Sequence, residues 1–266
     1  ADHASGRTTR KRLTKLRHAG YLLKHRIPVV TPGANGAAPV YYLTKAGADL
    51  LASYFDDETY AALNTRHPRG DRLNHWISLN DTRMGIEQAI AAQSDVELEA
   101  WVSEWQTVNT DAAEPERFYL HTQLNDSPPL SCSPDAAFVL SMENHHAKKV
   151  FYVERDLGTS SPKQNAARKT KGYAVLSERR LHRKHVPIRN VLETFGVLFI
   201  TTSNYRRRMT AKEVSRKPRP DLWLFVDEND LTPETFLHSP ITYDHNGVAG
   251  PLVRKPEAAN AQESVE

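Results

Sequence analysis

The chain has 266 residues, a single cysteine and a formal net charge of +3. This length is sufficient for one large or two small domains with a buried core. No run of about 18 apolar residues occurs, which excludes a membrane-spanning segment, and no apolar segment near the start is typical of a secretory signal. The lone Cys132 excludes an internal disulfide framework and a cysteine-rich zinc site, so we expect a reducing, cytoplasmic compartment.

The charge is strongly segregated along the chain. Basic residues outnumber acids in 1–26, 148–185 and 206–219, whereas 49–116 contains fourteen acids and four arginines. Each basic block by itself is also typical of a solvated helix face. Three such blocks together indicate a polyanionic partner, and we expect a nucleic acid bound to one face that carries all three.

The first elements, over 1–56, resemble the second half of a winged helix-turn-helix domain. The pattern predicts a basic helix over 10–18, extended runs over 24–30 and 40–43, a hairpin tip between them, and a helix over 45–54 capped by Thr44. The basic helix is the expected recognition helix. The side chains expected to contact DNA there are Thr9, Arg10, Lys11, Arg12, Lys15 and Arg17.

Two points qualify this N-terminal prediction. A winged helix normally has two helices before the recognition helix, so we expect the domain to be incomplete at its N-terminus. A helix–hairpin–helix used only for packing or dimerisation is the alternative.

The remaining chain predicts a linker over 57–74, an α/β domain over 75–250 and a disordered tail over 251–266. The expected order begins with a helix (75–93), a strand (97–106) and a polar loop (109–130) that includes a short strand at 118–120. Strands at 134–140 and 149–155, a basic helix (164–183) and a buried strand (197–202) come next. A short helix (210–215) and a strand (221–226) complete the order.

Three carboxylates lie at the ends of two of these strands. Asp135 stands at the entry of one strand, and Glu154 and Asp156 project from the same side of the next because they are two positions apart. Like charges so close repel unless a cation lies between them, and hard oxygen ligands select Mg²⁺ or Mn²⁺. Such an ion polarises a phosphoryl oxygen and activates water. The alternative is an exposed strand end bonded to arginines such as Arg155 or Arg168.

Basic side chains downstream complete a phosphoryl-transfer pattern. Lys169 and Lys171 follow on the predicted basic helix, where a lysine can stabilise charge that develops on phosphorus. Beyond the buried strand, a DNA backbone clamp and a solvated loop are equally good interpretations of three consecutive arginines: Arg206, Arg207 and Arg208.

Other candidate groups carry less information. A tyrosine nucleophile would form a covalent DNA adduct, but the spacing selects neither Tyr173 nor Tyr205. The histidine pairs at 145–146 and at 182 and 185 lack cysteine partners, so we expect exposed or phosphate-contacting side chains rather than zinc ligands. No glycine-rich phosphate loop is present, so ATP use is not expected.

Several strings resemble the replication-relaxation family of mobile-element proteins and the related mobilisation class C relaxases. They are the Pro134-Asp135 strand entry, FYVERDLGT, ARKTKGY and VLFITTSNYRRR, and the likeness extends over 8–226. It implies a winged helix followed by a restriction-endonuclease-like αβββαβ core of the PD-(D/E)XK type. By position, Asp135 and Glu154 match the metal-binding carboxylates of that core, and Glu104 matches an acid that some members supply from the first strand.

The chain departs from this family pattern at one position. Asp156 stands where many such enzymes have the motif lysine, and Lys169, four residues before a tyrosine, matches a lysine of the family. The resemblance implies a metal-dependent relaxase that nicks one strand at the transfer origin of a plasmid or integrative element. The partners it implies are double-stranded and single-stranded DNA, a conjugation coupling protein and a second copy of the chain. A non-catalytic DNA-binding accessory or regulator, and a defence or restriction nuclease, are the alternatives.

Overall fold

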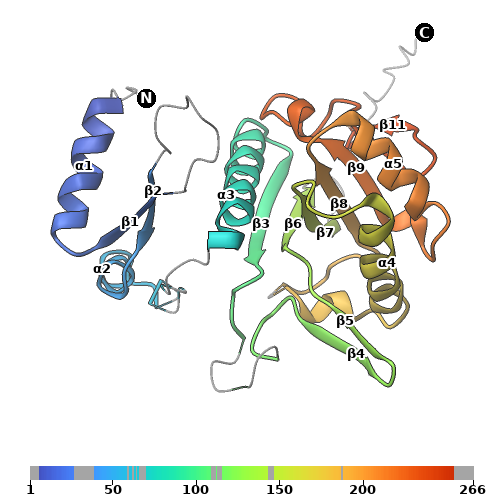
Figure 1. Cartoon of the computed structure of the whole chain (residues 1–266), viewed down its shortest axis with the longest axis horizontal. Coiled ribbons are helices and arrows are strands. Elements are labelled where there is room, and N and C mark those ends of the chain that lie inside the picture. The colour runs from blue at the N-terminus through green and yellow to red at the C-terminus, as the bar shows by residue number, and fades with distance from the viewer. Residues whose placement is uncertain are drawn as a thin grey trace, which may run out of the picture. The chain divides into compact units, whose positions relative to one another are not determined.

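The computed structural model describes residues 6–26, 39–58, 60–61, 63, 65, 70–108, 112, 116–142, 147–186 and 188–254. The chain forms two compact units, one comprising Ala1–Ile77 with Trp105–Thr107 and the other Ser78–Glu104 with Val108–Glu266. Figure 1 shows helices together with a large mixed sheet. This composition confirms the predicted α+β class.

The first unit contains a helix, a hairpin and a second helix. α1 (Gly6–His18) precedes β1 (Leu22–Arg26), which pairs antiparallel with β2 (Pro39–Leu43), and α2 (Lys45–Phe55) follows. Thr44 caps α2 as predicted, because its side chain accepts a hydrogen bond from the Gly47 backbone N–H at 3.1 Å. α1 has no buried residue, and it starts before the predicted position, so Thr9 lies inside the helix. The predicted hairpin tip lies outside the described residues.

The second unit is built on a seven-stranded sheet of order β11-β10-β9-β8-β7-β6-β3. Its central strands β7, β8 and β9 are parallel, and the other neighbours are antiparallel. The bounds are β3 (Val96–Ser103), β6 (Ala136–Met142), β7 (Ala147–Asp156), β8 (Gly196–Thr201), β9 (Trp223–Asp227), β10 (Thr242–Tyr243) and β11 (Ala249–Gly250). A separate hairpin joins β4 (Thr122–Asp126) to β5 (Pro129–Cys132).

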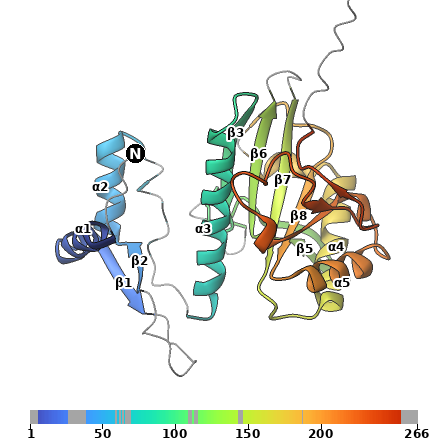
Figure 2. The ribbon, with the colours of Figure 1, turned by 90° about the horizontal axis from the view of Figure 1, so that it is seen from above.

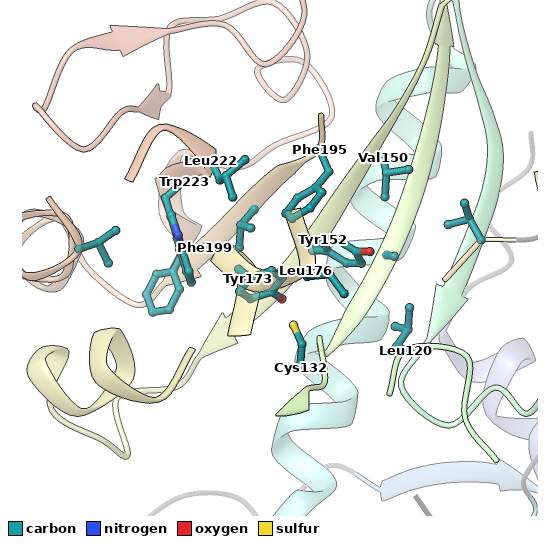
Figure 3. Close-up of a cluster of buried hydrophobic side chains, with 14 of the residues drawn as sticks. Leu120, Cys132, Val150, Tyr152, Tyr173, Leu176, Phe195, Phe199, Leu222 and Trp223 are labelled. Atoms are coloured by element: carbon teal, nitrogen blue, oxygen red, sulfur yellow. The ribbon is translucent and has the colours of Figure 1, made fainter. Parts of the chain in front are cut away.

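Helices cover both faces of this sheet. α3 (Gly70–Ala91), whose residues from 78 onward belong to this unit, lies on one face, and α4 (Pro162–Glu178) and α5 (Asn204–Val214) lie on the other (Figure 2). Alternate residues of the strands supply two cores. Phe151 and Val153 pack on the α3 side, whereas Tyr152 packs on the α4 side beside Tyr173, as Figure 3 shows. The alternation along β7 therefore places Phe151 and Val153 on the face opposite to Glu154 and Asp156, which agrees with the predicted common side of these two carboxylates.

Several predicted boundaries are wrong. α3 begins at Gly70, so it includes the end of the predicted linker, and the buried Leu73 extends its apolar face by one turn. The expected polar loop over 109–130 contains β4 and the start of β5, which were missed because each short strand buries only one side chain, Leu124 or Cys132. Residues 118–120 form turns and a bridge rather than a strand.

The later helices also differ from their predicted bounds. α4 ends at Glu178, and Arg180 (φ 54°) leads into a separate 3-10 helix, Leu181–Lys184. Within α4, Ala166 is buried whereas the next residue, Ala167, is exposed. α5 begins at Asn204, six residues earlier than predicted, so the three consecutive arginines are helical rather than in a loop. The strands β10 and β11 were not predicted, and residues 255–266 of the predicted tail lie outside the described residues.

Within the described residues, no helix combines the length and the apolar character that a bilayer crossing requires.

Candidate active site

Three carboxylates lie next to one another at the same end of three neighbouring strands, β3, β6 and β7. β3 pairs antiparallel with β6, and β6 pairs antiparallel with β7. One residue beyond the last pair of each register, Glu104 lies opposite Asp135, and Asp135 lies opposite Glu154. The backbone N–H of Glu104 donates to the carbonyl oxygen of Asp135 at 3.2 Å. Because residues opposite one another in a sheet point to the same face, all three side chains share the α4 side. We call Glu104, Asp135 and Glu154 the acidic row.

The first two members of the acidic row lie close together. One carboxylate oxygen of Glu104 lies within 4.8 Å of one of Asp135. Oδ2 of Asp135 also accepts a hydrogen bond from the backbone N–H of Arg155 at 2.7 Å, which orients the carboxylate, and 14% of the Asp135 side chain is exposed. Two hard oxygen donors at such a separation are a common protein contribution to a Mg²⁺ site.

Glu154, the third member, is held by two side chains of α4. Its Oε2 forms an ion pair with Nζ of Lys169, and its Oε1 accepts a hydrogen bond from the Tyr173 hydroxyl at 2.6 Å. Nζ of Lys169 also lies 3.6 Å from Oδ1 of Asp135. A capping box at Ser161 starts α4, and residues four apart on a helix share a face, so Lys169 and Tyr173 reach the row together.

The electrostatics of this group favour a positive lysine and a neutral tyrosine. Burial raises the pKa of Glu154 to about 8, although Lys169 opposes this shift. Burial alone would lower the pKa of Lys169, but Asp135 and Glu154 outweigh it and hold that pKa above its usual range. Burial and the Glu154 carboxylate raise the pKa of Tyr173 well above its usual value. Tyr173 is therefore a hydrogen-bond donor that positions Glu154, and this disfavours it as a nucleophile.

Asp156, although on the same side of β7, does not join the acidic row. Its carboxylate receives two nitrogens of Arg206, with Nε–Oδ2 2.9 Å and Nη2–Oδ2 2.7 Å. The backbone N–H of Gly158 and the hydroxyl of Thr201 donate to the same carboxylate at 3.1 and 3.3 Å. Asp156 thus ties the end of β7 to the start of α5, and a cation at Asp156 would have to displace Arg206.

The bond to an arginine agrees with the alternative interpretation of Asp156, but the carboxylate is buried and does not lie at an exposed strand end. Arg206 is the partner, not Arg155 or Arg168. The Arg155 side chain instead lies on the α3 side, where it bonds to Ser78 and Glu228.

The other predicted site residues of the second unit lie outside the acidic row. Lys171 is exposed on α4. Arg207 is buried, bonds to Asn204 at 2.9 Å and lies 3.4 Å from the centre of the Tyr243 ring, whereas Arg208 is exposed. The predicted DNA contacts of α1 are exposed and belong to the first unit. They are Thr9, Arg10, Lys11, Arg12, Lys15 and Arg17.

The downstream histidines are core residues, contrary to the prediction of exposed or phosphate-contacting side chains. His185 is 1% exposed and bridges the hydroxyls of Tyr152 (2.8 Å) and Thr122 (2.5 Å). Burial lowers its pKa to about 4, with further repulsion from His182. His182 is also buried, and its Nε2 contacts the Leu192 carbonyl at 3.0 Å. Residues 145 and 146 lie outside the described residues.

A family model for replication-relaxation proteins matches residues 1–191. The chain belongs to the replication-relaxation family. This confirms the resemblance to that family for the strings up to residue 191, and the family indicates a role in plasmid replication or mobilisation. The likeness to mobilisation class C relaxases stays a prediction. The match includes the acidic row, Lys169 and Tyr173, and it ends before β8 and α5. No curated protein and no solved structure is detectably similar to the chain.

Proposed function

We propose that this protein is a divalent-metal-dependent enzyme that nicks one strand of DNA at the transfer origin of a plasmid or integrative element. The observation that carries the proposal is the contact of one lysine, Lys169, with two carboxylates of the acidic row, Asp135 and Glu154. The family membership supplies the DNA context. We assign the order α3, β3, β6, β7, α4, β8 to an endonuclease-like core, and α1 with the β1–β2 hairpin to a winged-helix DNA reader.

The donor set suits a hard cation. Asp135 and Glu104 would hold Mg²⁺ or Mn²⁺, since Mg²⁺ is commonly bound by one or two carboxylates, with water and phosphate oxygens filling the other positions. When bound, such an ion supplies Lewis-acid polarisation of the phosphate and a more acidic water.

The chain's own residues would then orient and stabilise the reacting phosphate. Lys169, held as a cation by the carboxylates, offers positive charge to the oxygens on which negative charge develops. Glu154 keeps the Lys169 ammonium at the row, and Tyr173 fixes the Glu154 carboxylate. The exposed cations of α1 would bind duplex DNA. A conjugation coupling protein and a second copy of the chain are the further partners we propose.

A nicking assay tests this function. Supercoiled plasmid that carries the cognate transfer origin is incubated with the full chain in Mg²⁺, in Mn²⁺ or in EDTA. We expect conversion to the open circle only with metal, and a loss of at least about 100-fold in Asp135→Asn, which corresponds to about 3 kcal/mol of transition-state stabilisation. The control Asp126→Asn changes an exposed acid of β4 and should nick as the wild type does. Equal nicking by Asp135→Asn and wild type would remove Asp135 from the site.

A non-catalytic DNA-binding accessory is the second candidate, and one observation favours it. The oxygens of Glu154 and Asp156 are already bonded to protein donors, so among the described residues these two carboxylates do not form an open cation site. Origin binding without cleavage in either metal would support this candidate over the enzyme.

A further inference from the structure

The three consecutive arginines of α5 have different environments. Arg206 is bonded to Asp156 and to the Ser160 carbonyl, and Arg207 is buried against Tyr243. Arg208 is exposed, and so is Lys212. Neither Arg208 nor Lys212 forms an ion pair with any residue that the structure describes. Only one of the three arginines therefore presents its charge freely to solvent.

Arg208 belongs to a narrow exposed stripe along the helix. Tyr205, Arg208 and Lys212 are spaced i, i+3 and i+7, which places them on one face of α5. Tyr205 is 65% exposed, so its ring is open to solvent. We call Tyr205, Arg208 and Lys212 the α5 stripe.

The α5 stripe starts at the same end of the strands as the acidic row. β7 and β8 are parallel, so their carboxyl ends lie at the same edge, where Glu154 is near the end of β7 and α5 begins just after β8. The bond from Arg206 to Asp156 fixes the first turn of α5 at that edge. Tyr205 is therefore at the end of the stripe nearer to the carboxylates, and Lys212 is farther away.

The neighbouring helix adds positive charge to the same face. α4 and α5 pack side by side on this face (Figure 2). The exposed surface of α4 carries three cations: Lys163, Arg168 and Lys171. A polyanion lying across these helices meets cations on both of them.

We propose that the α5 stripe binds a nucleic-acid strand with unpaired bases. Arg208 and Lys212 contact successive phosphates, and one base stacks on the Tyr205 ring. Cations in line with an exposed aromatic ring are the features by which proteins hold single strands without reading their sequence. The direction of the stripe, toward the acidic row, rests on the proposed function, whereas strand binding itself requires neither metal nor cleavage.

Binding of a fluorescent 20-nucleotide oligothymidylate to the full chain in EDTA tests this proposal. Anisotropy is measured from 0.1 to 1 M salt for the wild type and for the double variant Arg208→Gln/Lys212→Gln. Two lost phosphate contacts should lower the slope of log K against log salt by about 1.4, which corresponds to about 25-fold weaker binding at 0.1 M if the two lines meet at 1 M. The control Arg180→Gln/Arg183→Gln removes the same charge from exposed arginines that pair with Glu193, and it should lose much less affinity.

A second pair of variants tests the stacking. Tyr205→Ala should weaken binding by about 5- to 150-fold, the range expected for one stacked base, whereas Tyr205→Phe should bind like the wild type. Equal losses in the α5 double variant and the arginine control, or unchanged binding of Tyr205→Ala, would overturn the proposal. If Asp135→Asn fails to nick but binds the oligonucleotide normally, the stripe stands. If the α5 double variant binds normally while the wild type nicks, only the stripe fails.

Discussion

Acidification should destabilise the second unit through His185. The ring is 1% exposed and is bonded on both sides, to the hydroxyls of Tyr152 and Thr122. A second ring proton would place a charge in the core and would force the hydroxyl that donates to the ring to turn its own proton away. Burial is the main cause of the shift that lowers its pKa from 6.5 to about 4. Because the folded state binds the proton more weakly than the unfolded state does, this contribution to stability is complete above about pH 6.5 and is lost as the pH falls through about 4.

The size of the effect follows from the shift. A difference of about 2.5 pKa units corresponds to about 3 kcal/mol. Urea unfolding of the wild type and of His185→Gln at several pH values isolates it, since glutamine keeps a donor and an acceptor but does not titrate. The difference in the free energy of unfolding between the two proteins should shrink by about 3 kcal/mol between pH 7 and pH 4. A difference that stays constant over this range would refute the assignment of His185 as a buried neutral bridge.

Two further predictions concern the frame of the site. Asp156→Ala should lower the free energy of unfolding by about 3 kcal/mol, because it leaves Arg206 without its buried partner. The control Arg208→Ala on α5 should change it by less than about 0.5 kcal/mol. Equal effects of the two substitutions in a urea titration would contradict this prediction. Gly172→Ala should destabilise the folded protein by about 1–3 kcal/mol, because a Cβ at this position would lie 2.9 Å from the Ser131 carbonyl oxygen. The control Gly85→Ala should stabilise it by up to about 1 kcal/mol, because a Cβ there would meet only a methyl of Leu231 at 4.0 Å.

The strands that carry the site could be predicted because their patterns are local. The alternation along β7 correctly separates Phe151 and Val153 from the carboxylate side, and the continuous apolar run of β8 correctly predicts a fully buried strand. The position of Lys169 on a helix after Glu154 could also be predicted, and the structure brings its ammonium to the carboxylates.

The different environments of Glu154 and Asp156 could not be predicted from spacing. Both side chains leave the same face of β7, but the bond to Arg206 depends on a helix that begins after the next strand, fifty residues farther along the chain. The α5 boundary could not be predicted because its first turn, Asn204–Arg207, buries no apolar side chain: Tyr205 is exposed, and the buried residue Arg207 is a cation stacked on an aromatic ring. Tertiary contacts of this kind leave no periodic signal in the sequence.

A single comparison on α4 tests the central claim, that the acidic row and its lysine form the active site. Lys169→Met and Lys171→Met remove the same charge two residues apart, one at the row and the other on the exposed face. Single-turnover cleavage of an end-labelled transfer-origin strand in Mg²⁺, with folding of both variants checked by urea titration, gives the rate for each. The account predicts a rate at least about 100-fold below wild type for Lys169→Met and a wild-type rate for Lys171→Met. Equal rates in two folded variants would contradict it.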